Sequence, residues 1–395
     1  MHRPLAHEDP TTALLALILA GGRLASRRRL LGDCGDAVSA LAAGRARWQA
    51  AGLDRRQCQA LLAPDADALA HARQWLAASP QHRLISLVDA AFPALLAHAP
   101  EPPLGLFVAG DADLLWQPMV AIVGSRSATP SGQTIAGNLA RQLCARQLCV
   151  ASGLAAGIDA AAHRASLQVA GNSVAVVGAG LDRCYPAGHR HLQDQLVQRG
   201  AVISEYAPGT PPRAGNFPAR NRLLAGLSLA VIVVEAAQRS GAMITARLAS
   251  EAGREVFAVP GSPLNPLSRG CNRLLRDGAG LLESIDDLLP ALPPLLRLLG
   301  TSLPGQAPNP ASADTLPAVL VSGPVLDETE QRQVWQALDL IGVDLDELGQ
   351  RSGLTVARLS AILLDLELAG WALQTHGRWQ RAPTPPSTTA SIDAG

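Results

Sequence analysis

Lysine is absent from this 395-residue chain, so all 33 of its cationic side chains are arginine. A site that needs a titratable or Schiff-base lysine is therefore excluded. The chain also has no excess charge of either sign, because 33 Asp and Glu residues balance the arginines. A protein whose whole surface coats nucleic acid is normally basic. Any site for a polyanion must therefore be a local pocket.

The six cysteines show no Cys-x-x-Cys spacing and no Cys/His set with the spacing of zinc ligands. We interpret them as free or buried thiols in a reducing compartment. No uninterrupted apolar run approaches the ~20 residues that a membrane-spanning helix requires. These absences predict a cytoplasmic protein without a metal site.

The length predicts two to three domains at about 150 residues each. Residues 1–80 are rich in Ala, Leu and Arg with helical spacing, which predicts a small helical domain. Over residues 81–290, short apolar runs alternate with helical segments. Runs that are apolar on both faces are typical of parallel strands covered on both sides, so a doubly wound α/β sheet is expected. The expected strands are 84–88, 104–108, 120–123, 148–151, 174–177, 202–204, 229–234 and 256–259.

The C-terminal part divides by composition. Residues 291–317 hold much of the proline together with Ser, Gly and Ala, which is typical of a linker. Residues 318–382 contain three helical stretches followed by two short alternating runs, which is the order of a winged helix. The tail, 383–395, is rich in Pro, Ser and Thr and is expected to be disordered.

Loops after the strands of a parallel sheet are where ligands bind. Four of these loops combine small residues with the start of a helix: 124–129, 152–159, 178–182 and 235–245. Small residues let the backbone approach an anion, and a helix N-terminus supplies N–H groups. Each loop alone is equally typical of an ordinary α/β turn. Together they predict a surface for a polyphosphate or a nucleic-acid backbone. The loop at 178–182 lacks the third glycine of a dinucleotide fingerprint, so no cofactor is predicted.

The local positive charge lies at Arg213, Arg220 and Arg222, because no acidic residue occurs between Glu205 and Glu235. On a helix, Arg220 and Arg222 would point about 200° apart, which predicts that one contacts phosphate and the other braces the fold. Phe217 lies beside these arginines and is either a stacking platform for a base or a core anchor.

No serine nucleophile motif accompanies His163, so no catalytic residue is predicted, although a hydrolase stays open. Asp159 and His163 are four residues apart, which predicts a hydrogen bond between them on one helix face.

These motifs in this order resemble the DNA-processing protein A (DprA/Smf) family of bacteria. The motifs are FPALL at 92–96, LFVAG at 106–110, VGSR at 123–126, SGLAAGID at 152–159, SEY at 204–206, FPARNRLLAGLS at 217–228, EAAQRSGAMIT at 235–245, GREVFAVPG at 253–261 and GCN at 270–272. The resemblance implies a sterile-alpha-motif-like helical N-terminal domain, an extended Rossmann domain and a C-terminal winged helix. It also implies a non-enzymatic protein that binds and protects single-stranded DNA, forms a homodimer through the Rossmann domain, and loads the RecA recombinase during natural transformation.

Carried over by motif, Gly124, Ser125 and Arg126 would hold a phosphate, and Phe217 would meet a base. Some members use a lysine in this pocket, and Arg213 is the candidate substitute here. Members commonly have Ser-Gly-Ser where this chain has Ala242 as the third residue. The residues expected to contact DNA are Gly124, Ser125, Arg126, Ser152, Gly153, Gly157, Arg213, Phe217, Arg220, Asn221, Arg222, Ser240, Gly241, Thr245, Arg269 and Asn272.

Two points depart from a simple DNA-binding interpretation. Between residues 318 and 381, five arginines stand against nine acidic residues, a net charge of −4. Such a charge would repel duplex DNA, so this module is expected to contact protein or to bind DNA weakly.

Arg27, Arg28 and Arg29 are expected to be exposed, either as a solvated helix end or as a contact for DNA or a partner. The alternative function is a nucleotide-hydrolysing enzyme of the phosphoribohydrolase-like Rossmann class, although its Pro-Gly-Gly-x-Gly-Thr motif is absent at residues 260–263.

Overall fold

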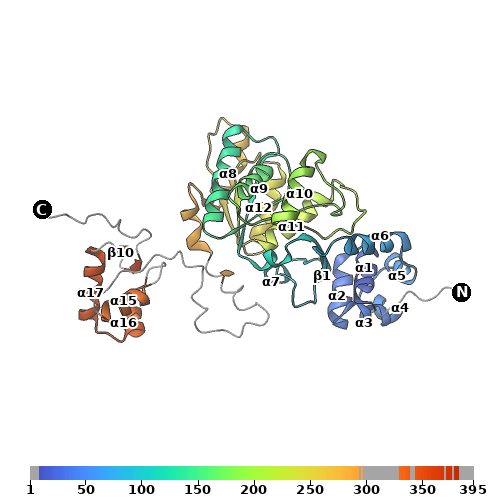
Figure 1. Cartoon of the computed structure of the whole chain (residues 1–395), viewed down its shortest axis with the longest axis horizontal. Coiled ribbons are helices and arrows are strands. Elements are labelled where there is room, and N and C mark those ends of the chain that lie inside the picture. Colours follow the sequence, from blue (N-terminus) through green and yellow to red (C-terminus); the bar gives the residue numbers. More distant parts are fainter. Residues whose placement is uncertain are drawn as a thin grey trace. The chain divides into compact units, whose positions relative to one another are not determined.

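The computed structural model describes residues 9–292, 295–296, 329–338, 343–368, 371–375 and 378–381. The chain divides into two compact units, residues 1–313 and 314–395 (Figure 1). The predicted tail and most of the predicted linker lie outside the described residues. Within the described ranges, no helix is long and apolar enough to cross a membrane.

Aspartates set the starts of the N-terminal helices. The side chains of Asp9, Asp36, Asp54 and Asp65 each accept a hydrogen bond from a backbone N–H in the first turn that follows, which is the usual role of an N-cap residue. The helices are α1 (Pro10–Leu19), α2 (Leu24–Cys34), α3 (Ala37–Ala42), α4 (Gly44–Ala50), α5 (Arg55–Leu62) and α6 (Ala66–Ala77). The predicted helical character of this region is confirmed.

These helices share their core with the sheet. Leu15 of α1 and Trp75 of α6 pack in one cluster with Phe107. The expected exposure of Arg27 is wrong, because its buried guanidinium donates to the carbonyls of Leu17 and Ile18, each at 2.9 Å. Arg27 therefore satisfies the C-terminal carbonyls of α1, and burial lowers its pKa to about 10.

The central sheet has nine strands in the order β1-β2-β6-β5-β4-β3-β7-β8-β9. The strands are β1 (His82–Ser86), β2 (Gly105–Gly110), β3 (Met119–Val123), β4 (Cys149–Ser152), β5 (Ser173–Val176), β6 (Ala201–Ser204), β7 (Ala230–Val233), β8 (Glu255–Ala258) and β9 (Gly280–Leu281). Each of the eight predicted runs overlaps one of β1 to β8. The predicted parallel pairing holds from β6 to β9, whereas at the other side of the sheet β1 pairs antiparallel with β2 and β2 antiparallel with β6. Burial of both faces makes β2 apolar throughout, so composition does not distinguish its direction.

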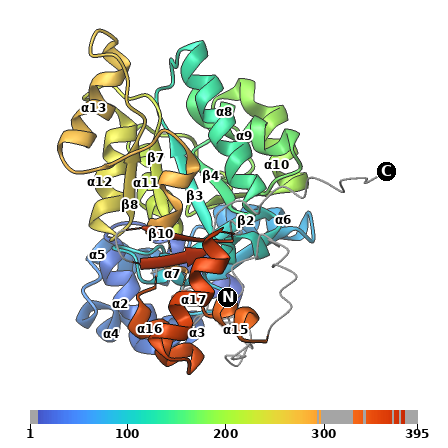
Figure 2. The same ribbon diagram turned by 90° about the vertical axis from the view of Figure 1, so that its left-hand side faces the viewer.

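Helices cover both faces of the parallel part of the sheet (Figure 2). Val120 and Ile122 pack against α8 (Pro130–Ala145) and α9 (Ile158–Gln168), whereas Ala121 and Val123 lie in the cluster with α11 (Asn216–Leu227) and α12 (Gly241–Glu251). Successive residues of a strand point to opposite faces, so a strand between two helical layers must be apolar at every position. The structure also describes the helices α7 (Ala94–Ala97), α10 (Arg190–Arg199) and α13 (Arg269–Arg276) in this unit, with 3₁₀ turns at Ala112–Trp116, Ala187–His189, Pro266–Ser268, Ile285–Asp287 and Leu289–Ala291.

The C-terminal unit has the predicted winged-helix order. Helices α15 (Thr329–Ala337), α16 (Leu345–Ser352) and α17 (Val356–Leu368) precede an antiparallel hairpin of β10 (Ala372–Thr375) and β11 (Arg378–Arg381). Val334, Leu348, Leu363 and Trp379 share its core. A bridge between Val343 and Trp379 ties the start of α16 to the hairpin.

A buried arginine joins two helices and the start of β8, and its removal tests how much the fold depends on it. The Arg254 guanidinium donates to the carbonyls of Leu95 and Gly226, at 2.8 and 2.9 Å. Arg254→Ala is expected to lower the free energy of unfolding by about 2–4 kcal/mol, because both buried carbonyls lose a charged donor. Arg247 on α12 is exposed and pairs with Glu251, so Arg247→Ala is expected to cost no more than about 0.5 kcal/mol. Urea unfolding followed by circular dichroism measures both variants, and equal losses would contradict the role given to Arg254.

Candidate nucleic-acid interface

The loops that follow β3, β4, β5 and β7 lie together where these parallel strands end. We call this end of the sheet its carboxyl edge. Two of these loops are in direct contact with each other. The Ile158 N–H donates to the carbonyl of Ser125 at 3.2 Å, which joins the loop after β3 to the start of α9. Gly157 has a φ of +78°, and a Cβ there would lie 2.2 Å from the Ser125 oxygen. Glycine at 157 is therefore required by the approach of two loops.

The start of α8 already holds a carboxylate. Glu235, at the end of β7, accepts from the Thr129 N–H at 2.9 Å and from the Thr129 hydroxyl at 2.6 Å. The Thr129 hydroxyl in turn accepts from the Gly132 N–H at 3.0 Å. A negative charge is stabilised at a helix N-terminus, and Glu235 supplies it from within the protein. A phosphate near Gly124 and Ser125 would therefore depend on Arg126 rather than on the Thr129 and Gly132 amides.

Asp159 shapes the loop after β4. Its Oδ2 accepts from the N–H groups of Gly153 and Ala155, at 3.1 and 3.3 Å. Burial raises the pKa of Asp159, and the nearby charge of Arg220 opposes that shift. The expected hydrogen bond from Asp159 to His163 is wrong: His163 Nδ1 bonds to the Ser173 hydroxyl at 2.8 Å. Both side chains are buried and find nearer partners than each other.

Arg220 and Arg222 are both engaged within the protein. Arg220 is 5% exposed, donates to the carbonyl of Val176, and lies so close to Gly153 that a Cβ there would be 2.1 Å from Nη1. Arg222 forms a two-pronged ion pair with Glu205, at 2.5 and 3.1 Å. Both guanidinium groups brace loops at this edge. Contact of either with DNA stays a prediction.

Several other candidates also serve the backbone. Ser152 donates to the carbonyl of Ile122 at 2.6 Å. Asn221 and Thr245 both donate to the carbonyl of Gly241, at 3.3 and 3.1 Å, and so support the turn into α12 from behind. Asn272 bonds to both backbone groups of Gly261. The Ser240 hydroxyl is buried without a hydrogen-bond partner among the described residues.

Among the other predicted residues, Arg126, Arg213 and Arg269 are exposed and Phe217 is half-buried. The Arg126 Cζ lies over the Phe217 ring, 5.3 Å from its centroid, which is a cation–π geometry. Arg126, Arg213 and Arg269, together with Arg239, form no ion pair with another described residue. These arginines are therefore available to an anion from solution.

Sequence reasoning missed Tyr185. Its ring centroid is 5.2 Å from that of Phe217, with 40° between the ring planes. Loops after β3 and β5 and the first turn of α11 thus meet in what we term the basic-aromatic cluster: Arg126, Tyr185 and Phe217. The signal was available, since Tyr185 is one of only two tyrosines and follows the apolar run at 174–177.

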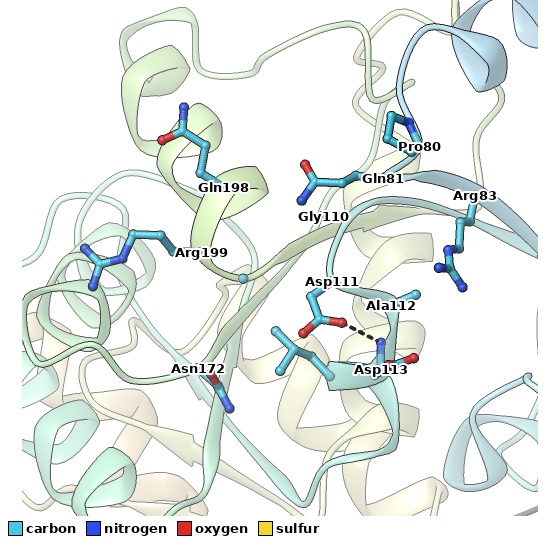
Figure 3. A pocket seen from close by; sticks show the side chains of 12 residues that line it. Pro80, Gln81, Arg83, Gly110, Asp111, Ala112, Asp113, Asn172, Gln198 and Arg199 are labelled. Atoms are coloured by element: carbon cyan, nitrogen blue, oxygen red, sulfur yellow. Dashed lines mark hydrogen bonds between the residues drawn. The ribbon is translucent and has the colours of Figure 1, made fainter.

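A mixed-charge pocket lies elsewhere on the sheet. A pocket of about 480 Å³ opens at the amino-terminal ends of β5 and β6, where Arg83, Arg199, Asp111 and Asp113 line it (Figure 3). One carboxylate oxygen of Asp111 accepts from the Asp113 N–H at 3.0 Å. The pocket is lined by both acidic and basic side chains, whereas the free charged groups at the carboxyl edge are arginines. Among the residues that the structure describes, no group of His, Cys, Asp and Glu is placed to hold a metal ion.

Comparison with known proteins covers both units. A family model described as DNA recombination-mediator protein A matches residues 83–293, and one described as the DprA winged helix domain matches residues 306–378. Protein Smf of Escherichia coli is 37% identical over 335 residues, which is 84% of this chain and 86% of that protein. DNA processing protein DprA of Streptococcus pneumoniae is 46% identical over 204 residues, 52% of this chain and 72% of that protein. The X-ray structure of DprA from S. pneumoniae superposes with a TM-score of 0.64 at 36% identity, covering 71% of this chain and 97% of that one.

The buried His163 behind these loops makes stability depend on pH. Burial, together with the nearby charge of Arg220, lowers its pKa to about 3. An unfolded histidine is protonated below about pH 6.5, whereas His163 in the folded protein is not protonated until about pH 3. Between these two values the unfolded state binds one more proton, so a lower pH favours unfolding. Between pH 6.5 and 4.5, wild type is expected to lose about 2–3 kcal/mol more stability than His163→Gln, by denaturant unfolding at each pH. His191 is exposed, so His191→Gln serves as the control and is expected to follow wild type. Parallel curves for wild type and His163→Gln would contradict this account.

Proposed function

This chain belongs to the DNA recombination-mediator protein A family, and on that premise we propose that it binds single-stranded DNA at the carboxyl edge of its sheet. We further propose that it acts by binding, as a homodimer through the Rossmann domain, and loads a RecA recombinase onto strands taken up in natural transformation.

The observation that carries the proposal is the basic-aromatic cluster. Arg126 is exposed and lies over the ring of Phe217 in the first turn of α11, and the ring of Tyr185, from the loop after β5, lies beside Phe217. A guanidinium group binds phosphate oxygens in a fixed fork, and aromatic rings stack on unpaired bases of any sequence. In a duplex the base faces are already covered by their neighbours, so this combination favours a single strand without sequence preference.

The distribution of charge supports a local contact with the DNA. Three further arginines are exposed near the starts of helices: Arg213 before α11, Arg239 before α12 and Arg269 at the first position of α13. Because the chain has no net charge, these local arginines must supply the attraction. Arg213, four residues before Phe217, is the proposed substitute for the lysine that some members carry.

The winged helix is proposed to contact protein or to bind DNA only weakly. Its third helix, α17, begins beside an ion pair, because Arg358 pairs with Glu330 at 2.7 Å. Arg351 of α16 pairs with Glu347 at 2.6 Å. Both guanidinium groups thus already lie against carboxylates, which weakens their attraction for phosphate.

Removal of Arg126 tests the site directly. Arg126→Ala is expected to lower the affinity for a labelled single-stranded oligonucleotide by roughly 10- to 150-fold, the equivalent of about 1.5–3 kcal/mol for a charged contact. Arg199→Ala removes an exposed arginine at the opposite edge of the sheet and is the matched control, expected to bind as wild type. Fluorescence anisotropy across a salt series measures affinity and the number of phosphates neutralised, with a slope of roughly 0.7 for each.

Equal affinity for single and double strands, or no effect of Arg126→Ala, would contradict the proposed site. Turnover of small nucleotides by the same preparations would favour the hydrolase instead. The RecA part of the proposal is measured with the same variants, as the rate at which RecA assembles on strands coated with a single-strand-binding protein. Wild type and Arg199→Ala are expected to raise that rate, and Arg126→Ala to lose the effect.

Deletion of residues 314–395 tests the role given to the winged helix. The shortened protein is expected to retain single-strand affinity within about twofold, because the arginines that meet DNA lie in the first unit. The same anisotropy titration measures it, beside the full chain. A loss of tenfold or more would show that the winged helix holds DNA despite its acidic charge.

A further inference from the structure

Tyr185 stands apart from the other exposed apolar side chains. In the part of the chain that the structure describes, it is the only aromatic residue among the large hydrophobic side chains left exposed, at 47%. An open ring at a protein surface gives up the burial that aromatic residues usually obtain. Here the ring lies 5.2 Å from Phe217, in the loop between β5 and α10.

Phe217 is less open than its place among the arginines suggested. It is half-buried, with Arg126 over its ring and Tyr185 beside it. The preceding residue is anchored as well, because the side-chain amide of Asn216 donates to the carbonyl of Gly178 at 3.0 Å. Two contacts already occupy Phe217, so its ring is placed as a support.

The loop that carries Tyr185 is held in position from both sides. His189 Nδ1 bonds to the carbonyl of Leu154 at 2.9 Å, and the Gln193 amide donates to the carbonyl of Arg183 at 3.4 Å. A ring that is fixed before binding loses less conformational entropy when a ligand stacks on it.

We propose that Tyr185, rather than Phe217, presents the ring on which an unpaired base stacks. Phe217 supports Tyr185 from the side of α11, and Arg126 holds the adjoining phosphate. This assignment rests on the proposed single-strand binding and adds the residue that receives the base.

Crosslinking distinguishes the two rings. The chain has no lysine, so trypsin cleaves it only after arginine and places Tyr185 in the peptide 184–190 and Phe217 in the peptide 214–220. A strand that contains 5-iodouracil, irradiated in complex with the full-length protein, is expected to label peptide 184–190. Labelling of 214–220 without 184–190 would overturn the assignment.

Affinity measurements give an independent test. Because each variant is compared on strands with and without bases, a change in local packing affects both measurements and can be recognised. Tyr185→Leu keeps an apolar side chain but removes the ring, and it is expected to weaken binding of an oligothymidine about fivefold or more. Binding of an abasic strand of equal length, which keeps the phosphates, is expected to be unchanged. Tyr185→Phe keeps the ring and is expected to match wild type. Val169→Ala, at a residue that is 45% exposed beyond the far end of α9, is the matched control.

The outcomes separate the two proposals. If wild type binds no single strand, both fall. If Arg126→Ala weakens binding while Tyr185→Leu binds oligothymidine as wild type does, the site stands and the role of Tyr185 is wrong. Equal losses in Tyr185→Phe and Tyr185→Leu, or equal losses on both kinds of strand, would also overturn the stacking role.

Discussion

The candidate site depends on the anchoring of one buried arginine. Arg220 reaches inward from near the start of α11, donates to the carbonyl of Val176 at the end of β5, and lies against Gly153. A buried guanidinium is costly unless an opposite charge compensates it, and Asp159 supplies that charge. Phe217 precedes Arg220 by three residues, so the anchor also fixes the direction in which Phe217 leaves the helix.

Buried carboxylates perform the complementary task for the backbone. Asp159 holds the amides of Gly153 and Ala155, and Glu235 holds Thr129 at the start of α8. In both loops the negative charge belongs to the protein, and the free positive charge lies outside, on Arg126. The loops that resemble phosphate-binding loops thus use several of their backbone N–H groups in hydrogen bonds within the protein. This separation explains how a chain without net charge can present a basic surface at one edge.

The main features of the fold were predictable from the sequence. Short apolar runs located β1 to β8. The signal was clearest for β2 to β7, because a strand buried on both faces is mostly apolar. The antiparallel edge was not predictable, since β2 is equally buried on both faces and its direction leaves no trace in composition. β9 has two residues, too few to form a pattern. The winged helix followed from the order of three helical stretches and two alternating runs.

By itself, the sequence determined which segments could form a site and that its cations must be arginines. Only the tertiary structure decided which of those residues build the loops and which face solvent. Arg220 and Arg126 are chemically identical, but one is buried against Gly153 and the other lies exposed over Phe217. Tyr185 joined the site because two loops from different strands end at the same edge of the sheet. Such proximity is set by strand order and helix packing between residues distant in the chain, and no local pattern records it.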